Sequence, residues 1–180
     1  WRNRGNVRIV RHFYQAVDFN DGSGSTLAGL TLMNAPGGGV LCEDVDSVSI
    51  VNCSIQDNAD YGVEAIGECD ITIERSLIEG NGKSGLYAHD GCVFLLNGSV
   101  VRDNGWDGVD LEDNTSDSLT NNWIHNNGTA GESYGCGIWF ENYQSATPFV
   151  RNNTICGNPT YGIEVACPNL PTPIGPTLIS

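Results

Sequence analysis

Two short stretches of the sequence carry side chains that can move protons. The first, GLYAHD, holds Tyr87 and His89, and the second, GVDLED, holds Asp110 and Glu112 at the same two positions 23 residues later. Phenol, imidazole and carboxyl groups serve enzymes as general acids and bases. On a β-strand, Asp110 and Glu112 would lie about 6.7 Å apart, which suits the carboxyl pair of an inverting glycosidase. We therefore predict a catalytic set made of these four residues.

Carboxylates that could bind a metal ion gather in the same two stretches. Asp90 directly follows His89, and Asp113 directly follows Glu112. Calcium prefers oxygen ligands of this kind. A zinc site is not expected, because the sequence contains no CxxC pair. Calcium is the cofactor that the sequence suggests, on the ligands Asp90, Asp110, Glu112 and Asp113.

Aromatic and acidic residues flank the four candidates and predict contacts with a sugar. Trp106 and Trp139 would form aromatic walls, while Glu64 and Glu141 occupy outward positions in neighbouring repeats. Flat apolar faces beside hydrogen-bond acceptors are typical of carbohydrate sites. Trp106, Trp139, Glu64 and Glu141 are therefore the predicted substrate-binding residues.

An enzyme that acts on a uronate must also neutralise the carboxylate of its substrate. By the spacing of the repeat, the nearest cations are Lys83 and Arg102, and both fall in other parts of the unit. Calcium would then have to supply the positive charge. The alternative that needs no ligand at all is a solvated acidic strand face on an acidic protein.

These residues belong to a phrase that recurs along the chain, as in SIQDNADYGVEA, LIEGNGKSGLYA, VVRDNGWDGVDL and TICGNPTYGIEV. Within each unit, apolar residues at i and i+2 indicate three short strands, each followed by a turn. A fixed period of this length is typical of a solenoid. We predict an all-β right-handed parallel β-helix of about seven coils of ~23 residues, beginning at Ala16 after a partial coil in residues 1–15. The recurring glycines are Gly39, Gly62, Gly85, Gly108, Gly137 and Gly162, with successive differences of 23, 23, 23, 29 and 25.

An asparagine precedes the glycine in five of the units. Coils of a solenoid stack about 4.8 Å apart, so these side chains should form a ladder that satisfies the backbone of a repeated turn. The ladder residues are Asn58, Asn81, Asn104, Asn127 and Asn158.

The repeat resembles that of pectate-lyase-like right-handed β-helix proteins along nearly the whole chain. GLYAHD (Gly85–Asp90) is also similar to the GFDPHD-type motif of alginate epimerases, with Tyr87 in place of the motif's first Asp and Ala88 in place of its Pro. The resemblance implies a role for His89 and Asp90 in moving protons on a uronate polymer.

Charge and cysteine content narrow the partners and the compartment. A formal net charge of −14 argues against nucleic acid or an anionic membrane as partner, and no apolar run is long enough to span a bilayer. Seven cysteines and five Asn-X-Ser/Thr sequons fit an extracellular or cell-surface protein. Cys69 and Cys92 fall in the same slot of adjacent coils, where either a disulfide or a buried stack of two thiols would fit.

The two ends of this single predicted domain, residues 1–180, differ in composition. Four arginines (Arg2, Arg4, Arg8 and Arg11) precede the first acid, whereas residues 168–180 are rich in proline. A basic start and an acidic body favour head-to-tail stacking of copies. We predict a structural or adhesive module that forms filaments or is part of a longer β-helix. The alternative is a polysaccharide-acting enzyme (lyase, epimerase or glycosidase) or a carbohydrate-binding fragment.

Overall fold

A computed structural model of the chain describes residues 14–20, 24–113, 116–131, 134–141, 148–166 and 178–179. Within these ranges the chain forms strands joined by turns, and no segment is helical. Correspondingly, no helix in the described ranges could cross a membrane. The arginines at positions 2, 4, 8 and 11, most of the partial coil predicted in residues 1–15 and most of the proline-rich segment lie outside the described residues.

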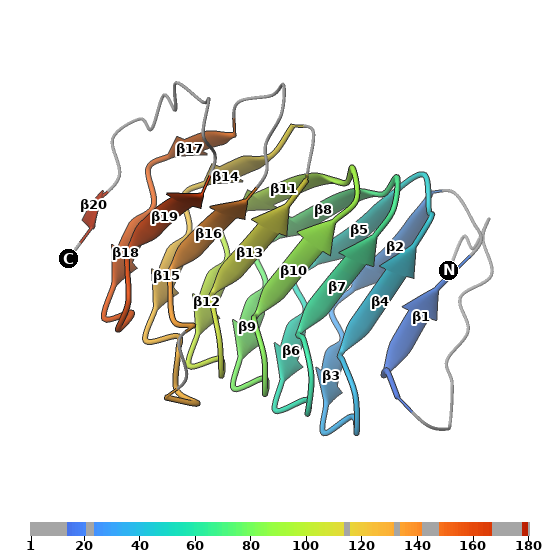
Figure 1. Cartoon of the computed structure of the whole chain (residues 1–180). Coiled ribbons are helices and arrows are strands. Elements are labelled where there is room, and N and C mark those ends of the chain that lie inside the picture. Colours follow the sequence, from blue (N-terminus) through green and yellow to red (C-terminus); the bar gives the residue numbers. More distant parts are fainter. Residues whose placement is uncertain are drawn as a thin grey trace.

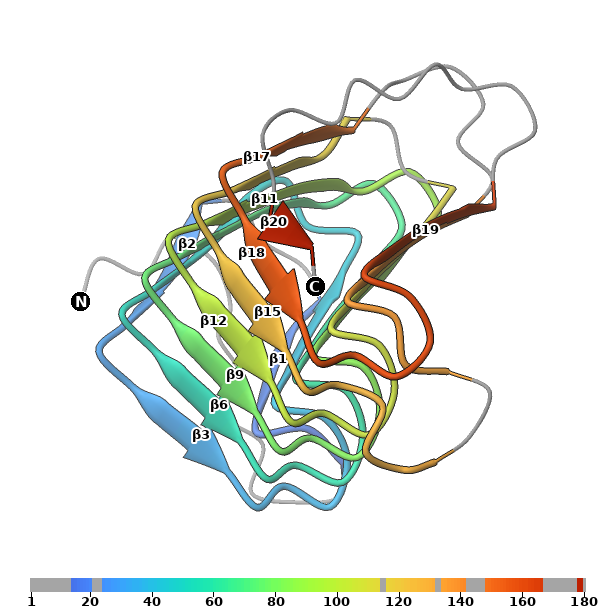
Figure 2. The ribbon, with the colours of Figure 1, turned by 90° about the vertical axis from the view of Figure 1, so that its left-hand side faces the viewer.

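The strands form three parallel sheets that run along three sides of the stack (Figures 1 and 2). Sheet A contains β1 (Val17–Phe19), β4 (Val40–Glu43), β7 (Val63–Ile66), β10 (Leu86–His89), β13 (Val109–Glu112), β16 (Ile138–Glu141) and β19 (Ile163–Ala166). Sheet B contains β2 (Ser25–Ala28), β5 (Val48–Val51), β8 (Asp70–Glu74), β11 (Val93–Asn97), β14 (Ser118–Thr120) and β17 (Phe149–Arg151). Sheet C contains β3 (Thr31–Met33), β6 (Ser54–Gln56), β9 (Leu77–Glu79), β12 (Val100–Arg102), β15 (Trp123–His125), β18 (Thr154–Cys156) and β20 (Leu178–Ile179).

The register follows the sequence period. Leu86 pairs with Val63 on one side and with Val109 on the other, a step of 23 residues each time. Each strand of sheet A from β1 to β16 is followed by one of sheet B and one of sheet C before the chain returns to sheet A. The predicted β-helix is therefore confirmed. The seven strands of sheet A make six steps, close to the predicted seven coils.

Alternation along each strand decides which side chains fill the interior. In β13, Val109 and Leu111 are fully buried in the core, so Asp110 and Glu112 between and after them project from the outer face. The same pattern makes Phe94 and Leu96 core residues of β11 while Leu95 faces outward. The outward placement that the sequence predicted for the candidate residues follows from this alternation.

The predicted asparagine ladder is present. Asn81 Nδ2 donates to Asn104 Oδ1 at 3.0 Å and to the Ile55 carbonyl at 3.3 Å. Asn81 Oδ1 in turn accepts from the backbone N–H and the Nδ2 of Asn58, at 3.2 and 2.9 Å. Asn127 is linked to Asn158 in the same way, so the ladder continues across the longer loop that separates them.

A second ladder, which the sequence analysis missed, lies at the turn between sheets B and C. The backbone N–H of each residue donates to the side chain of the next, from Ser76 to Ser99 at 3.1 Å and from Ser99 to Asn122 at 2.9 Å. Asn122 then donates to Asn153 Oδ1 at 2.9 Å. Either Ser or Asn accepts the one N–H in each coil. The position therefore has no single recurring residue type by which the sequence could reveal it.

The disulfide predicted as one alternative for Cys69 and Cys92 is not formed. Both are free thiols, as are all the cysteines of the described ranges. All of these are buried except Cys156, which is half-buried. The Cys69 thiol donates to the Ile66 carbonyl at 3.0 Å, and the Cys92 thiol donates to the Gly67 carbonyl at 3.0 Å. Both residues lie in turns between sheets A and B, and the equivalent turns of adjacent coils stack with the two side chains in parallel, which favours the thiol stack.

Candidate functional site

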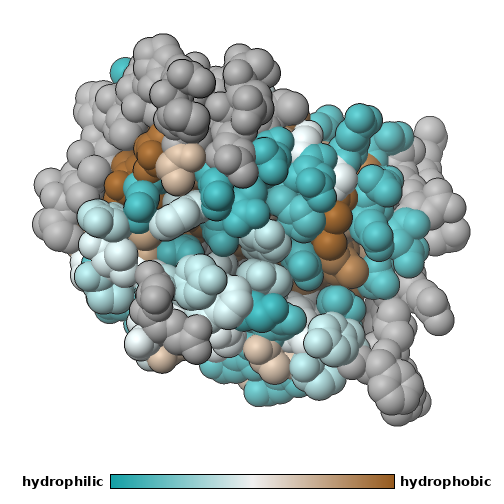
Figure 3. Space-filling model, in the orientation of Figure 1, coloured by the Kyte–Doolittle hydropathy of each residue, from teal (hydrophilic) through white to brown (hydrophobic). Residues whose placement is uncertain are grey.

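The outer face of sheet A is acidic along its whole length. Its strands present seven carboxylates and one histidine outward, and none of these seven strands contains Lys or Arg. Figure 3, in the orientation that brings sheet A forward in Figure 1, shows hydrophilic side chains over much of this side, interrupted by apolar patches. The carboxylates are Asp18, Glu43, Glu64, Asp110, Glu112, Glu141 and Glu164.

Four aromatic side chains form a continuous wall beside these carboxylates. Tyr87 stacks on Tyr61 with ring centroids 4.7 Å apart, and Tyr61 meets Trp106 edge-to-face at 6.1 Å. Trp106 stacks on Tyr134 at 4.7 Å. Three of the rings come from three successive coils, and Tyr134 comes from the next connection, so the wall runs along the axis of the stack. We call Tyr61, Tyr87, Trp106 and Tyr134 the aromatic wall.

Lys83 brings a positive charge to this wall, contrary to the expectation that it would lie in a separate part of the coil. Its ammonium sits 4.4 Å from the ring centroid of Tyr61 and 5.3 Å from that of Trp106. It also forms an ion pair with Asp60 at 2.6 Å. The turn before β10 folds the side chain back toward sheet A. Arg102 behaves as predicted, because it pairs with Glu79 on sheet C.

The longer connection between Gly128 and Cys136, which makes the step from Gly108 to Gly137 29 residues instead of 23, is hydrogen-bonded to a residue next to the aromatic wall. Asp107, only 1% exposed, accepts hydrogen bonds from the backbone N–H groups of Gly135 at 3.0 Å and Cys136 at 2.6 Å. Burial raises the pKa of this carboxyl, and the two N–H donors oppose the rise. By fixing the end of the insertion, Asp107 holds Tyr134 where it can stack on Trp106.

Asp110 is the most unusual of the outward carboxyls. It is 7% exposed, and its Oδ1 has no hydrogen-bond donor. Burial, followed by the charges of Asp107, Glu112 and Glu141, raises the pKa of Asp110 to about 8. The carboxyl is therefore protonated in neutral solution and can give up a proton when a cation approaches.

Replacement of Asp110 by asparagine should flatten the dependence of stability on pH. The pKa of Asp110 rises from 3.8 to about 8 on folding, so the native protein keeps a proton that the unfolded chain loses. The contribution of Asp110 to the free energy of unfolding is therefore fully present below about pH 4 and is lost as the pH rises to about 8. In urea unfolding across this range, the free energy of unfolding of Asp110→Asn should decrease less steeply with pH than that of the parent. At the alkaline end Asp110→Asn should be the more stable protein. Asp70→Asn, an exposed change on β8 in sheet B, should keep the parent slope, and equal slopes for all three proteins would contradict the prediction.

The other predicted catalytic residues lie beside Asp110. The Tyr87 hydroxyl donates to Glu112 at 3.2 Å, and Tyr87 and His89 hold their rings 4.9 Å apart. Burial raises the pKa of Glu112, and burial together with the carboxylates Glu112 and Asp110 raises that of Tyr87. His89 Nδ1 lies 2.8 Å from Asp90, which holds the imidazole at the end of the strand. The four predicted residues therefore share one patch on β10 and β13.

The predicted substrate-binding residues extend this patch in both directions. Trp139 pairs with Asp110 in the sheet register, and its indole N–H donates to Glu141 at 3.3 Å. Glu64 pairs with Tyr87 on the other side. Burial and the nearby Asp60 raise the pKa of Glu64, while Lys83 lowers it.

The predicted calcium site is not assembled. Across the part of the chain that the structure describes, no group of three or more His, Cys, Asp or Glu side chains is placed to hold a metal ion. Asp90 is engaged by His89, and Asp113 lies beyond the strand at a backbone φ of 52°, in the turn that follows. The side chains of Asp90, Asp110, Glu112 and Asp113 therefore do not converge.

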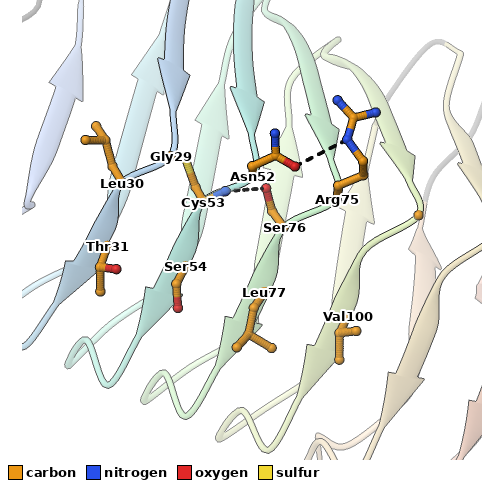
Figure 4. A pocket seen from close by; sticks show the side chains of 11 residues that line it. Gly29, Leu30, Thr31, Asn52, Cys53, Ser54, Arg75, Ser76, Leu77 and Val100 are labelled. Carbon is orange, nitrogen blue, oxygen red and sulfur yellow. Dashed lines mark hydrogen bonds between the residues drawn. The ribbon is translucent and has the colours of Figure 1, made fainter.

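A shallow groove of about 460 Å³ lies away from this face, at the corner between sheets B and C (Figure 4). Arg75 at its rim donates to Asn52 Oδ1 at 3.3 Å, and Ser76 accepts from the backbone of Cys53 as part of the second ladder. Its polar groups therefore serve the turn, and none of the predicted site residues lines it.

Comparison with known proteins places the fold in a family. The sequence matches the model described as "Right handed beta helix region" over residues 15–169. The chain therefore belongs to the right-handed β-helix family, as the repeat predicted. A comparison with curated proteins gives no match.

Two solved structures from Azotobacter vinelandii are similar to the chain. One is the A-module of mannuronan C-5 epimerase AlgE4, at 13% identity and a TM-score of 0.34, with 87% of this chain and 65% of that chain covered. The other is the A-module of mannuronan C-5 epimerase AlgE6, at 11% identity and a TM-score of 0.42, with 89% of this chain and 65% of that chain covered. The chain thus spans about two-thirds of the length of each module.

Proposed function

We propose that the outer face of sheet A binds a polysaccharide. The observation that carries this proposal is the aromatic wall running along the stack beside a row of carboxyls. Aromatic rings supply apolar surface to a sugar, and carboxyl groups accept or donate hydrogen bonds to its hydroxyls. A glycan chain laid across the coils of β7, β10 and β13 would meet both kinds of group.

Preorganisation supports binding on this face. Tyr87 is held between Tyr61 and His89, and its hydroxyl is fixed by Glu112. Tyr134 is held through the insertion that Asp107 anchors. Side chains that are ordered before the ligand arrives lose little conformational entropy on binding.

Loss of one ring from the wall should weaken glycan binding. Tyr87→Ala removes the stack on Tyr61 and the hydrogen bond to Glu112, and we expect affinity to fall about tenfold, or 1.4 kcal/mol. Isothermal titration against neutral, amino and uronate polysaccharides measures the change. Trp123→Ala is the matched control, because Trp123 is 49% exposed and lies on sheet C. No binding to any glycan by the parent protein, or an equal loss in both variants, would refute the proposal.

Catalysis on the bound glycan is the second candidate, and Asp110 is the observation that favours it. A carboxyl with a pKa of about 8 can act as a general acid in neutral solution, with Glu112 two residues further along the strand as the second carboxyl. Turnover of a polysaccharide that is lost in both His89→Ala and Tyr87→Phe, with an unchanged circular dichroism spectrum, would establish it. Binding without turnover would leave the protein a carbohydrate-binding module.

A structural or adhesive role through head-to-tail stacking stays a prediction, as does an extracellular location. The arginines at positions 2, 4, 8 and 11 that would make the contact lie outside the described residues. Free thiols at Cys69 and Cys92 do not require an oxidising compartment.

A further inference from the structure

The charge of the sheet A face restricts which polysaccharide it can hold. Seven outward carboxyl groups, of which Asp110 is protonated in neutral solution, line its strands without any Lys or Arg, and the whole chain carries a formal net charge of −14. A uronate polymer would bring a carboxylate to each sugar and would be repelled along the face. Lys83 is a single cation and is already neutralised by Asp60.

Lys83 also shows how this surface holds an ammonium group. Its Nζ lies over the ring of Tyr61 at 4.4 Å, near Trp106 at 5.3 Å and in an ion pair with Asp60 at 2.6 Å. Aromatic faces attract cations through their quadrupole, and a carboxylate completes the pairing. One coil further on, Asp110 and Glu112 lie next to Tyr87 of the same wall.

One carboxyl oxygen of Asp110 is buried without a hydrogen-bond partner. The side chain is more than nine-tenths buried, projects from the outer face between Tyr87 of β10 and Trp139 of β16, and its Oδ1 receives no hydrogen bond. Buried carboxyl oxygens are normally paired, and an unpaired one costs free energy. The titratable groups that face it are acidic or phenolic, and the indole N–H of the neighbouring Trp139 is donated to Glu141, so the missing partner is a cation or a donor supplied by a ligand. These groups are Asp107, Glu112, Glu141 and Tyr87.

We propose that the polysaccharide is one that carries free amino groups, a polymer of deacetylated hexosamine, and that Asp110 receives one of its ammonium groups. This inference rests on the proposed polysaccharide binding and names its substrate class. Glu112 and Glu141 flank the ammonium, and the wall at Tyr87 contacts the adjacent sugar. The ammonium lowers the pKa of Asp110, because a nearby opposite charge favours the ionised carboxyl, and the proton of Asp110 is released to solvent.

The test compares oligomers that differ in one group. Glucosamine oligomers, N-acetylglucosamine oligomers of the same length and uronate oligomers are titrated into the whole protein in mildly acidic solution at low and high salt. We expect the amine oligomer to bind at least tenfold more tightly than the acetylated one and to lose most of that advantage at high salt. In Asp110→Asn the ratio of the affinities for the amine and the acetylated oligomer should shrink severalfold. Asp70→Asn on sheet B should keep the parent preference.

The possible outcomes distinguish failure of the amine inference from failure of the proposed polysaccharide binding. Equal binding of amine and acetylated oligomers, or tighter binding of uronates, would overturn the amine inference and leave glycan binding standing. An unchanged preference in Asp110→Asn would overturn the role of Asp110. A lysine oligomer of equal charge that binds as tightly as the glucosamine oligomer would show that charge alone is recognised and would overturn the sugar class. The absence of binding to every glycan would refute the proposed function itself.

Discussion

Replacement of Phe94 by alanine is expected to lower the free energy of unfolding by about 3–5 kcal/mol. Phe94 lies in β11 with none of its surface exposed, and β8 and β14 flank its strand in sheet B. The change removes apolar contacts and leaves a cavity in the core that the three sheets enclose. Urea unfolding followed by circular dichroism measures the loss.

The neighbouring residue provides the control. Leu95 is 40% exposed on the outer face of the same strand, so Leu95→Ala removes a side chain of the same chemical kind at nearly the same place. We expect its effect to stay within about 0.5 kcal/mol, as is usual for surface positions. Similar losses for the two variants would mean that the inward and outward assignment of β11 is wrong.

Replacement of Asn81 by leucine is expected to destabilise the protein by about 2–6 kcal/mol, from four hydrogen bonds worth about 0.5–1.5 kcal/mol each. The side chain donates to Asn104 and Ile55 and accepts twice from Asn58. Leucine has nearly the same size but neither donates nor accepts, so buried polar groups of two adjacent coils lose partners. The midpoint and slope of urea unfolding report the loss.

Gln56→Leu is the matched control for the ladder. It also exchanges an amide for leucine, but Gln56 lies on the outer face of β6, where it accepts a hydrogen bond from the Ser54 hydroxyl and donates weakly to the sulfur of Met33. A change of no more than about 0.5 kcal/mol is expected there. If Asn81→Leu were as mild as this control, the ladder would not be a source of stability.

The fold could be predicted from the sequence because one short-range rule is repeated. Each strand of sheet A after β1 begins one residue after a glycine, and the inward pair such as Leu86 and Ala88 recurs every 23 residues from β1 to β13. Parallel stacking then follows, since equal spacing places equal positions side by side. The same rule correctly predicted that Tyr87, Asp110 and Trp139 would share the outer face.

The aromatic wall could be predicted only in part, for a physical reason. Tyr61, Lys83 and Tyr134 stand in turns or in an insertion, where alternation does not fix the direction of a side chain. Their positions follow from the fold of the turn and from the hydrogen bonds to Asp107, which no local pattern in the sequence reveals. The one available signal was that Tyr61 directly precedes a repeat glycine, beside the outward position of β7.

The alternation of sheet A also bears on how such a protein can change over evolutionary time. Val109 and Leu111 are buried in the core, whereas Glu112 and its counterpart Glu141 in the next coil lie on the outer face and are only partly buried. Outer positions of this kind can be replaced with little effect on folding, and each replaced position contacts only the coils on either side. Specificity on this surface can drift by single substitutions, and whole coils can be duplicated or exchanged with the recognition residues they carry.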